Sequence, residues 1–292
     1  MKSLIIYIFV FTFVVFVGVV HQSCNVTTQR EGIDSLDTTV SNLETGSYSD
    51  TTNVVYTKYN IPLPVELYRF LRSNNSTFNT EILNPPDNAR NYNTEVKKSV
   101  NLGFYSSALA YCIVFEQNQQ GMEYLQTTHR LAKELHIDKG YDNTTIMRGK
   151  KNLNSNDSLN KLATTAYWLA CNYLETNGKI NILPFVIVGS WIESMHLAIN
   201  TLDMSKNGQE IMNKIAEEEK SLSSLITYLM DIMMDSNTFE MNRDVQDLSN
   251  KLEDLKKVYD KLKTNKKGVV ITKEQYHEIS KLIEQYRGDY IN

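Results

Sequence analysis

Two long segments that are apolar on almost every side constrain the fold of this chain most strongly. Residues 94–118 and 184–202 are each long enough for several helical turns, and their middle parts present hardly any polar side. A helix that is hydrophobic all round is buried on more than one face. The run Val186-Ile187-Val188 could form a buried strand by itself, but the length of its segment favours a helix. A small residue lets helices cross closely, which explains Gly103 and Gly189 within these segments.

Other segments have a single apolar face, which is typical of helices that cover such a core. A helix over 64–71 begins with Pro in its first turn, and residues 122–136 carry an apolar stripe. A further helix follows an N-cap region at 155–158 and stops at Asn177-Gly178. Only 12 Gly and 5 Pro in 292 residues argue against a turn-rich β fold. The sequence predicts an all-α fold, a multi-helix array of stacked antiparallel helix pairs.

The last third of the chain is more charged and has a different periodicity. Residues 207–235 and 239–264 carry apolar residues at alternating steps of three and four, as a coiled-coil seam does. Glu218 occupies one position of that seam. A turn at 235–237 would make residues 207–264 an antiparallel, coiled-coil-like hairpin. Thr272 and Gln275 then form a capping box for a terminal helix over 272–287.

The first 24 residues are typical of an exported, lipid-modified protein. Lys2 precedes a long apolar run, and Ser23 comes directly before Cys24. A basic start, an apolar middle and a small residue before the cleavage point form the secretory pattern. We interpret residues 1–23 as a lipoprotein signal peptide and Cys24 as the lipidated N-terminus. This predicts a cell-envelope protein held on the outer or inner membrane by its lipid, facing the periplasm or the exterior.

Two alternatives to this interpretation remain open. The apolar run is at the short end of what spans a bilayer, so a retained transmembrane helix is the first. A plain signal peptide, cut near Ser23 and leaving Cys24 unmodified, is the second. Residues 24–58 are rich in Thr, Ser, Asn and Asp and predict a flexible tether, because they cannot bury enough apolar surface to offset ordering. Residues 59–292 then form a single all-helical domain with its core at 94–204.

Composition and missing motifs exclude several classes of function. The formal net charge is −4, whereas a nucleic-acid-binding protein presents a basic face, so no nucleic-acid partner is expected. The sequence contains no Gly-rich phosphate loop, nucleophile elbow, Cys-x-x-Cys pair or zinc helix, so we expect no cofactor and assign no catalytic residue. Cys112 and Cys171 are read as buried thiols. A bridge between them stays open, because the envelope is oxidising.

Two pairs of residues have the spacing of metal ligands. Glu193-x-x-His196 and Glu274-x-x-His277 match a pattern that di-metal helical bundles use on two of their helices. A chain this rich in Glu produces such spacings by chance, and the second pair lies in the first turn of a polar helix. We therefore expect no metal site.

Glu193 is the most informative polar residue, because it lies in an apolar helix. A buried carboxylate needs a partner or a raised pKa. One interpretation is that Glu193 bonds a Tyr, an Arg or a helix terminus inside the core. The other is a ligand cleft in which Glu193 is the polar anchor, Trp191, Tyr105 and Tyr167 are the aromatic lining, and His196 lies nearby.

The stretches Val100-Asn101-Leu102-Gly103-Phe104-Tyr105 and Gly189-Ser190-Trp191-Ile192-Glu193 resemble two core helices of an uncharacterised all-helical lipoprotein family of the Bacteroidetes. The resemblance covers about residues 94–200. That family often has Asp where this chain has Ala108, so any polar role of that position is lost here. The resemblance implies a lipid-anchored helical body and brings no activity with it.

These features together predict a lipid-anchored envelope protein that binds or scaffolds an unidentified envelope protein or ligand. The contact would use the groove between the core helices or the C-terminal hairpin. The alternative is a small-ligand binder or an enzyme with Glu193 at its centre. Self-association through residues 207–264 is the third hypothesis.

Overall fold

The computed structural model describes residues 58–59, 61, 63–140, 167, 170–179, 181–206, 208–235, 239–265 and 268–292. All of these belong to one structural unit, Gly46–Asn292. The predicted leader, Cys24 and the predicted tether up to residue 57 lie outside the described residues, and so does the predicted N-cap region at 155–158.

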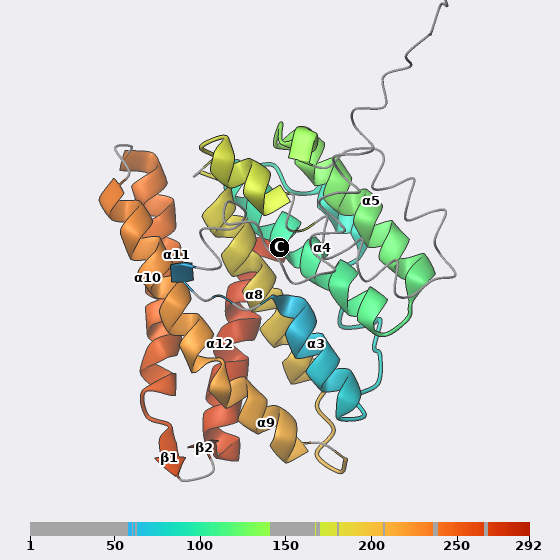
Figure 1. The fold of residues 1–292 in the computed structure, drawn as a ribbon, viewed down its shortest axis with the longest axis vertical. Coiled ribbons are helices and arrows are strands. Elements are labelled where there is room, and N and C mark those ends of the chain that lie inside the picture. Colours follow the sequence, from blue (N-terminus) through green and yellow to red (C-terminus); the bar gives the residue numbers. More distant parts are fainter. Residues whose placement is uncertain are drawn as a thin grey trace, which may run out of the picture. The chain divides into compact units, whose positions relative to one another are not determined.

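The described part of the chain is all-helical, as predicted (Figure 1). One small departure is a hairpin of two three-residue strands, β1 (Lys263–Asn265) and β2 (Gly268–Val270), in which Lys263 pairs with Val270. Residues 170–176 are also helical, and two single 3₁₀ turns occur at η1 (Pro86–Arg90) and η2 (Asp138–Gly140). The α-helices are α3 (Pro64–Ser73), α4 (Glu95–Val114), α5 (Asn118–Glu134), α8 (Leu183–Asn200), α9 (Gly208–Glu217), α10 (Glu219–Asp235), α11 (Phe239–Tyr259) and α12 (Lys273–Ile291).

The two segments that are apolar on every side form the central pair of helices, α4 and α8. All residues of α8 from Leu183 to Ile199 are buried, so the β-branched run belongs to a helix and not to a strand. The two helices cross at their glycines. A Cβ atom on Gly103 would lie 2.3 Å from the carbonyl oxygen of Val186, and one on Gly189 would lie 2.4 Å from that of Val100. Both glycines are therefore explained by close backbone packing, as expected.

Several helices in the described part of the chain end in the same way. A residue with positive φ follows each of α3, α4, α5 and the helix at 170–176, and the next amide bonds a carbonyl five residues back. Gly178, with φ of 63°, confirms the stop predicted at Asn177-Gly178. Glu116, with φ of 62°, performs this role after α4, and the Gln117 amide lies 2.8 Å from the Cys112 oxygen. Consequently α4 ends four residues before the predicted position at 118, and α5 begins at Asn118 instead of Met122.

The last third contains the predicted antiparallel hairpin, formed by α10 and α11 side by side (Figure 1). Its seam is buried inside the chain, at Leu222, Leu225, Leu229, Val245, Leu248, Leu252 and Leu255. The expectation of one continuous helix over 207–235 is wrong, because the chain breaks at Glu218 between α9 and α10. At this break the Ile215 carbonyl accepts a hydrogen bond from the Tyr259 hydroxyl at 2.9 Å and one from the Glu218 amide at 3.2 Å. The hydrogen bond from the amide spans three residues, whereas a continuous α-helix would use the amide four residues later.

The terminal helix α12 begins with the predicted capping box. Thr272 accepts a hydrogen bond from the Gln275 amide, and the Gln275 side chain accepts one from the Thr272 amide. The helix continues to Ile291, beyond the predicted end at 287. Its C-terminal turn packs on α4, where the Asn101 side chain donates to the Tyr290 carbonyl at 2.8 Å. This contact places side chains of α12 against α8, the helix that contains most of the predicted site residues.

Candidate functional site

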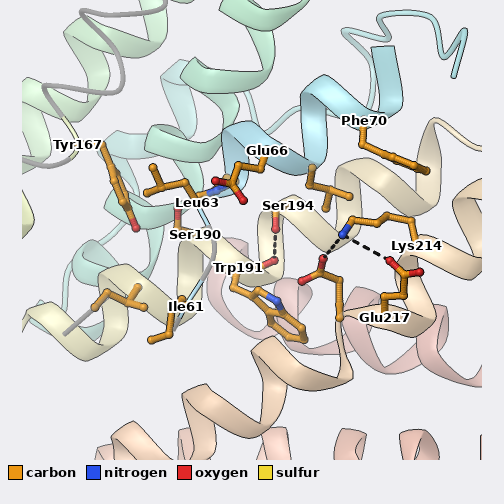
Figure 2. Close-up of a pocket in the computed structure, with 14 residues that line it drawn as sticks. Ile61, Leu63, Glu66, Phe70, Tyr167, Ser190, Trp191, Ser194, Lys214 and Glu217 are labelled. Atoms are coloured by element: carbon orange, nitrogen blue, oxygen red, sulfur yellow. Dashed lines mark hydrogen bonds and ion pairs between the residues drawn. The ribbon is translucent and has the colours of Figure 1, made fainter. Parts of the chain in front are cut away.

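A pocket of about 230 Å³ lies between α3, α8, α9 and the segment that leads into α3. Figure 2 shows Tyr167, Leu63 and Ser190 on one side of it, Lys214 and Glu217 on the other, and Trp191 below. The wall consists mainly of apolar side chains with a few polar groups, which is the usual make-up of a small-molecule site. The lining residues are Ile61, Leu63, Pro64, Glu66, Leu67, Phe70, Tyr167, Ile187, Ser190, Trp191, Ser194, Lys214, Glu217 and Glu218.

In the residues that the structure covers, two buried polar atoms of α8 in this lining lack a hydrogen-bond partner: the Ser190 hydroxyl and the Trp191 indole nitrogen. The exposed fractions of these residues are 1% and 4%. Buried polar groups in folded proteins are nearly always paired, and each unpaired one costs about 1–3 kcal/mol. These two atoms are therefore placed for a partner that enters the pocket.

The Ser190 hydroxyl differs from the other buried hydroxyls in the central helices. Ser106 bonds the Leu102 carbonyl of its own helix at 2.7 Å, and Ser194 bonds the Trp191 carbonyl at 2.7 Å. Such back-bonding is how a helical Ser usually satisfies itself. One local acceptor for Ser190 would be the Val186 carbonyl, whose oxygen would lie only 2.3 Å from a Cβ atom on Gly103 of α4. The close crossing of α4 and α8 thus crowds the surroundings of that acceptor.

The charged groups at the pocket are unequal in number. Three carboxylates, those of Glu66, Glu217 and Glu218, accompany one ammonium, that of Lys214. The Lys214 nitrogen lies 3.7 Å from Glu217 and 3.5 Å from Glu218, so both ion pairs are long. The buried Glu218 also accepts a hydrogen bond from Ser221 at 2.7 Å, whereas Glu66 is exposed. The wall is thus negative overall.

The structure separates the five residues of the predicted cleft. Trp191 and Tyr167 line the pocket, but Glu193, Tyr105 and His196 do not. Successive residues turn by about 100° around a helix, so Glu193 projects away from Trp191 and into the interior. Tyr105 lies in α4, where its hydroxyl donates to the Pro85 carbonyl at 2.9 Å. The idea of a cleft centred on Glu193 is therefore corrected by the geometry.

Glu193 is paired inside the core. Its side chain is fully buried and accepts two hydrogen bonds from Arg287 of α12, at 2.6 Å from Nε and 3.1 Å from Nη2. Burial alone would lower the pKa of Arg287, but the charge of Glu193 and these hydrogen bonds outweigh burial and raise it. This bidentate pair matches the first interpretation, in which an Arg satisfies Glu193.

His196 is engaged through both ring nitrogens. Nδ1 lies 2.7 Å from a carboxylate oxygen of Glu284, and Nε2 lies 2.8 Å from the Ile82 carbonyl oxygen. A carbonyl can only accept, so Nε2 carries a proton. Burial would raise the pKa of Glu284, but hydrogen bonds from His196 and Asn200 and the charge of His196 lower it on balance. His196 therefore holds α8, α12 and the loop at Ile82 together.

The two Glu-x-x-His pairs noted in the sequence lie in different surroundings. Glu193 and His196 bond Arg287 and Glu284 separately, while Glu274 and His277 are exposed on α12. Among the described residues, no group of three or more His, Cys, Asp or Glu side chains is placed to hold a metal ion. Cys112 and Cys171 are buried thiols that do not bridge each other.

Sequence reasoning missed most of the charged wall of the pocket. Lys214 and Glu217 lie on the outer face of an amphipathic helix, where charged residues carry no signal. Glu218 did have a signal, since it interrupts the apolar seam. Ser190 had none, because a Ser in a buried helix normally bonds its own backbone.

Comparisons with known proteins identify no relative: no protein-family model, curated protein or solved structure matches this chain. Within the described ranges, no helix combines the length and apolarity that a membrane span requires.

Proposed function

We propose that this chain is a lipid-anchored binding protein of the cell envelope, whose helical body holds a small ligand in the pocket between α3, α8 and α9. One observation carries the binding proposal: the Ser190 hydroxyl and the Trp191 indole nitrogen are buried at this pocket without partners. A ligand that accepts hydrogen bonds from these two atoms removes the free-energy cost of leaving them buried and unpaired in the unliganded protein.

The membrane attachment rests on the leader sequence. The basic residue Lys2, the apolar run and the Ser23-Cys24 pair support export and lipidation. Two acyl chains on one residue give stable anchoring, where one gives only marginal binding. Mass spectrometry of the mature N-terminus tests this directly. An acylated Cys24 is expected, and Met1 retained on a cytosolic protein would contradict it.

Binding is favoured over catalysis by the placement of the titratable groups. The core residues best suited to acid–base work, Glu193 and His196, are bonded to Arg287 and Glu284 and lie outside the pocket. Among the residues that the structure describes, the pocket lining contains no His and no Cys, so no described imidazole lies beside Ser190 to act as a base. Its polar groups can orient a ligand, which is what a binding site requires.

Binding of a small ligand is also favoured over self-association through 207–264. The seam residues of α10 and α11 face each other and are buried within the chain. A second copy would therefore find no seam to enter unless the hairpin opened. This leaves the pocket as the better supported contact site.

A fragment screen read by nuclear magnetic resonance tests the pocket. The chain has two Trp, so ¹⁵N-labelled protein gives two indole signals, and Trp168→Phe identifies the one from Trp191. We expect some fragments to shift the Trp191 signal. We expect Ser190→Leu, which fills the pocket from α8, to abolish those shifts, and Leu63→Phe, which narrows it from the half-exposed side, to weaken them.

Ser280→Leu is the matched control. Ser280 lies in α12, does not line the pocket, and bonds the Tyr276 carbonyl of its own helix at 2.8 Å. This variant should retain every shift. A chemically broad fragment set that leaves the Trp191 signal unmoved in the unaltered protein would refute the proposed pocket.

A further inference from the structure

The polar atoms at the pocket specify which chemical group a ligand brings to them. The Trp191 indole nitrogen can only donate a hydrogen bond, and the neighbouring Ser190 hydroxyl can donate as well. Both atoms are buried and have no acceptor within the described part of the chain. A ligand group that satisfies them must therefore be an acceptor, such as a carbonyl, ether or ring-nitrogen lone pair.

The charged wall specifies the sign of the charge that the pocket tolerates. An anionic ligand would meet Glu66, Glu217 and Glu218, and the cationic side chain in the described lining, Lys214, already faces two of them. A cationic ligand gains from the same imbalance. The exposed carboxylate of Glu66 lies on α3 at the pocket, where Figure 2 shows it above Ser190 and Ser194.

The remaining wall specifies an apolar middle for the ligand. Ile61, Leu63, Leu67, Phe70 and Ile187 line the same pocket as the polar groups of α8 and the carboxylates. A volume of about 230 Å³ is below the range of about 300–1,000 Å³ that drug-sized ligands occupy. The ligand is therefore small, with room for one ring or a short branched chain.

Resting on the proposed function, we infer that the pocket takes a small apolar amine with a hydrogen-bond acceptor at the opposite end. The acceptor bonds Trp191 and Ser190, the apolar middle lies between α3 and α8, and the ammonium faces Glu66. The two ends are recognised by different elements of the chain, so each can be tested separately.

Three matched probes test the inference: para-methoxybenzylamine, para-ethylbenzylamine and para-methoxybenzoate. They are similar in size, the second lacks the acceptor, and the third replaces the amine by a carboxylate. We expect the methoxy amine to bind roughly threefold to tenfold more tightly than the ethyl amine, the value of one hydrogen bond. We expect it to move the Trp191 indole proton downfield, and we expect the benzoate to bind most weakly.

Variants separate the contributions of the two ends. Glu66→Gln should weaken both amines roughly twofold to fivefold, as loss of a partly exposed ion pair does, and should not weaken the benzoate. Glu81→Gln is the matched control, because Glu81 is exposed and does not line the pocket. Ser190→Ala should remove part of the advantage of the methoxy amine over the ethyl amine without affecting Glu66.

The possible results distinguish the inference from the proposed function beneath it. If the benzoate binds best, or if the two amines bind equally while the Trp191 signal moves, the ligand class is refuted and the pocket stands. If neither these probes nor the fragment set moves that signal, the pocket itself is refuted, and the ligand class with it. Tighter binding of the methoxy amine than of the ethyl amine, together with weaker binding of both amines to Glu66→Gln, supports both.

Discussion

The crossing of α4 and α8 makes one substitution especially informative, Gly103→Ala. The added Cβ would lie 2.3 Å from the Val186 oxygen and 2.7 Å from the Ser190 nitrogen. Both obstructing atoms belong to the backbone of α8, so no side-chain rotation can relieve the contact. The two helices must separate by roughly 1 Å to restore ordinary distances, and the packing on both faces of each helix loosens with them.

The expected cost follows from two opposing effects. Overpacking of a core typically destabilises by about 1–3 kcal/mol, and a clash with backbone lies at the upper end of that range. Ala is better than Gly inside a helix by about 1 kcal/mol, which offsets part of the loss. We therefore expect a net loss of about 2 kcal/mol. For a domain of this size that lowers the Tm by roughly 4–8 °C.

Thermal and urea denaturation followed by circular dichroism measure this loss, with Gly288→Ala as the matched control. Gly288 lies in α12, and the nearest atom to its added Cβ is the Asn292 side-chain nitrogen at 3.8 Å, an ordinary contact. The control should gain up to about 1 kcal/mol from helix propensity alone. If Gly103→Ala is as stable as Gly288→Ala, the α4–α8 crossing is not as close as described, and the account of the unpartnered Ser190 hydroxyl fails with it.

Three further substitutions test the interactions around α12. Arg287→Met leaves Glu193 buried without its partner, so we expect the free energy of unfolding, measured by urea denaturation, to fall by about 3–5 kcal/mol. The double variant with Glu193→Leu should recover most of this loss. An unchanged urea midpoint for the single variant would contradict this. The folded-state pKa of Glu284 is lowered, so its contribution to stability is present above its unfolded value near 4.5 and is lost as the pH falls through the folded value. Glu284→Gln should therefore flatten the stability profile in that acidic window, and an identical profile would refute the role of the His196 contact. Thr272→Ala removes one half of the capping box and should cost about 1 kcal/mol, seen as faster amide exchange in the first turn of α12.

The core of the fold could be predicted because buried faces of helices require apolar residues at regular positions in the sequence. The segments that became α4 and α8 are apolar on every side, and only a helix buried all round explains that pattern. Gly103 and Gly189 could be assigned to close packing because each lies in the middle of one of these buried helices. The capping box at Thr272 was predictable because its two side chains serve a single local geometry.

The ends of helices were harder to predict than their interiors, because the sequence signals for helix ends are weaker. Gly178 marks its stop in the sequence, since Gly adopts positive φ without strain. Glu116 and His136 adopt the same conformation, with φ of 62° and 56°, and neither residue type indicates it. The hydrogen bonds around those ends and the burial of their neighbours favour the conformation. That information is tertiary and cannot be read from local composition.

The candidate site was only partly predictable, because α3 lies far in sequence from α8 and α9, which complete the pocket. Trp191, Tyr167 and Tyr105 were assigned to a cleft around Glu193 from their aromatic character; Trp191 and Tyr167 line the pocket, and Tyr105 does not. Glu193 was grouped with them from proximity along the chain, although helix geometry turns it inward to Arg287. The partner that decides its role lies 94 residues away in α12, a separation that no local pattern spans.

Glu218 interrupts the apolar seam of the last third of the chain, and it also lines the pocket. A carboxylate at an apolar seam position conflicts with a continuous helical hairpin, and the chain breaks there into α9 and α10. Burial of Glu218 is compensated by Ser221 and Lys214. Sequences usually agree with their fold at every level, and their exceptions concentrate at sites of function or strain. The residue that interrupts the seam also lines the pocket with Lys214 and Glu217. The interruption therefore adds one carboxylate to a wall whose negative balance favours the proposed cationic ligand.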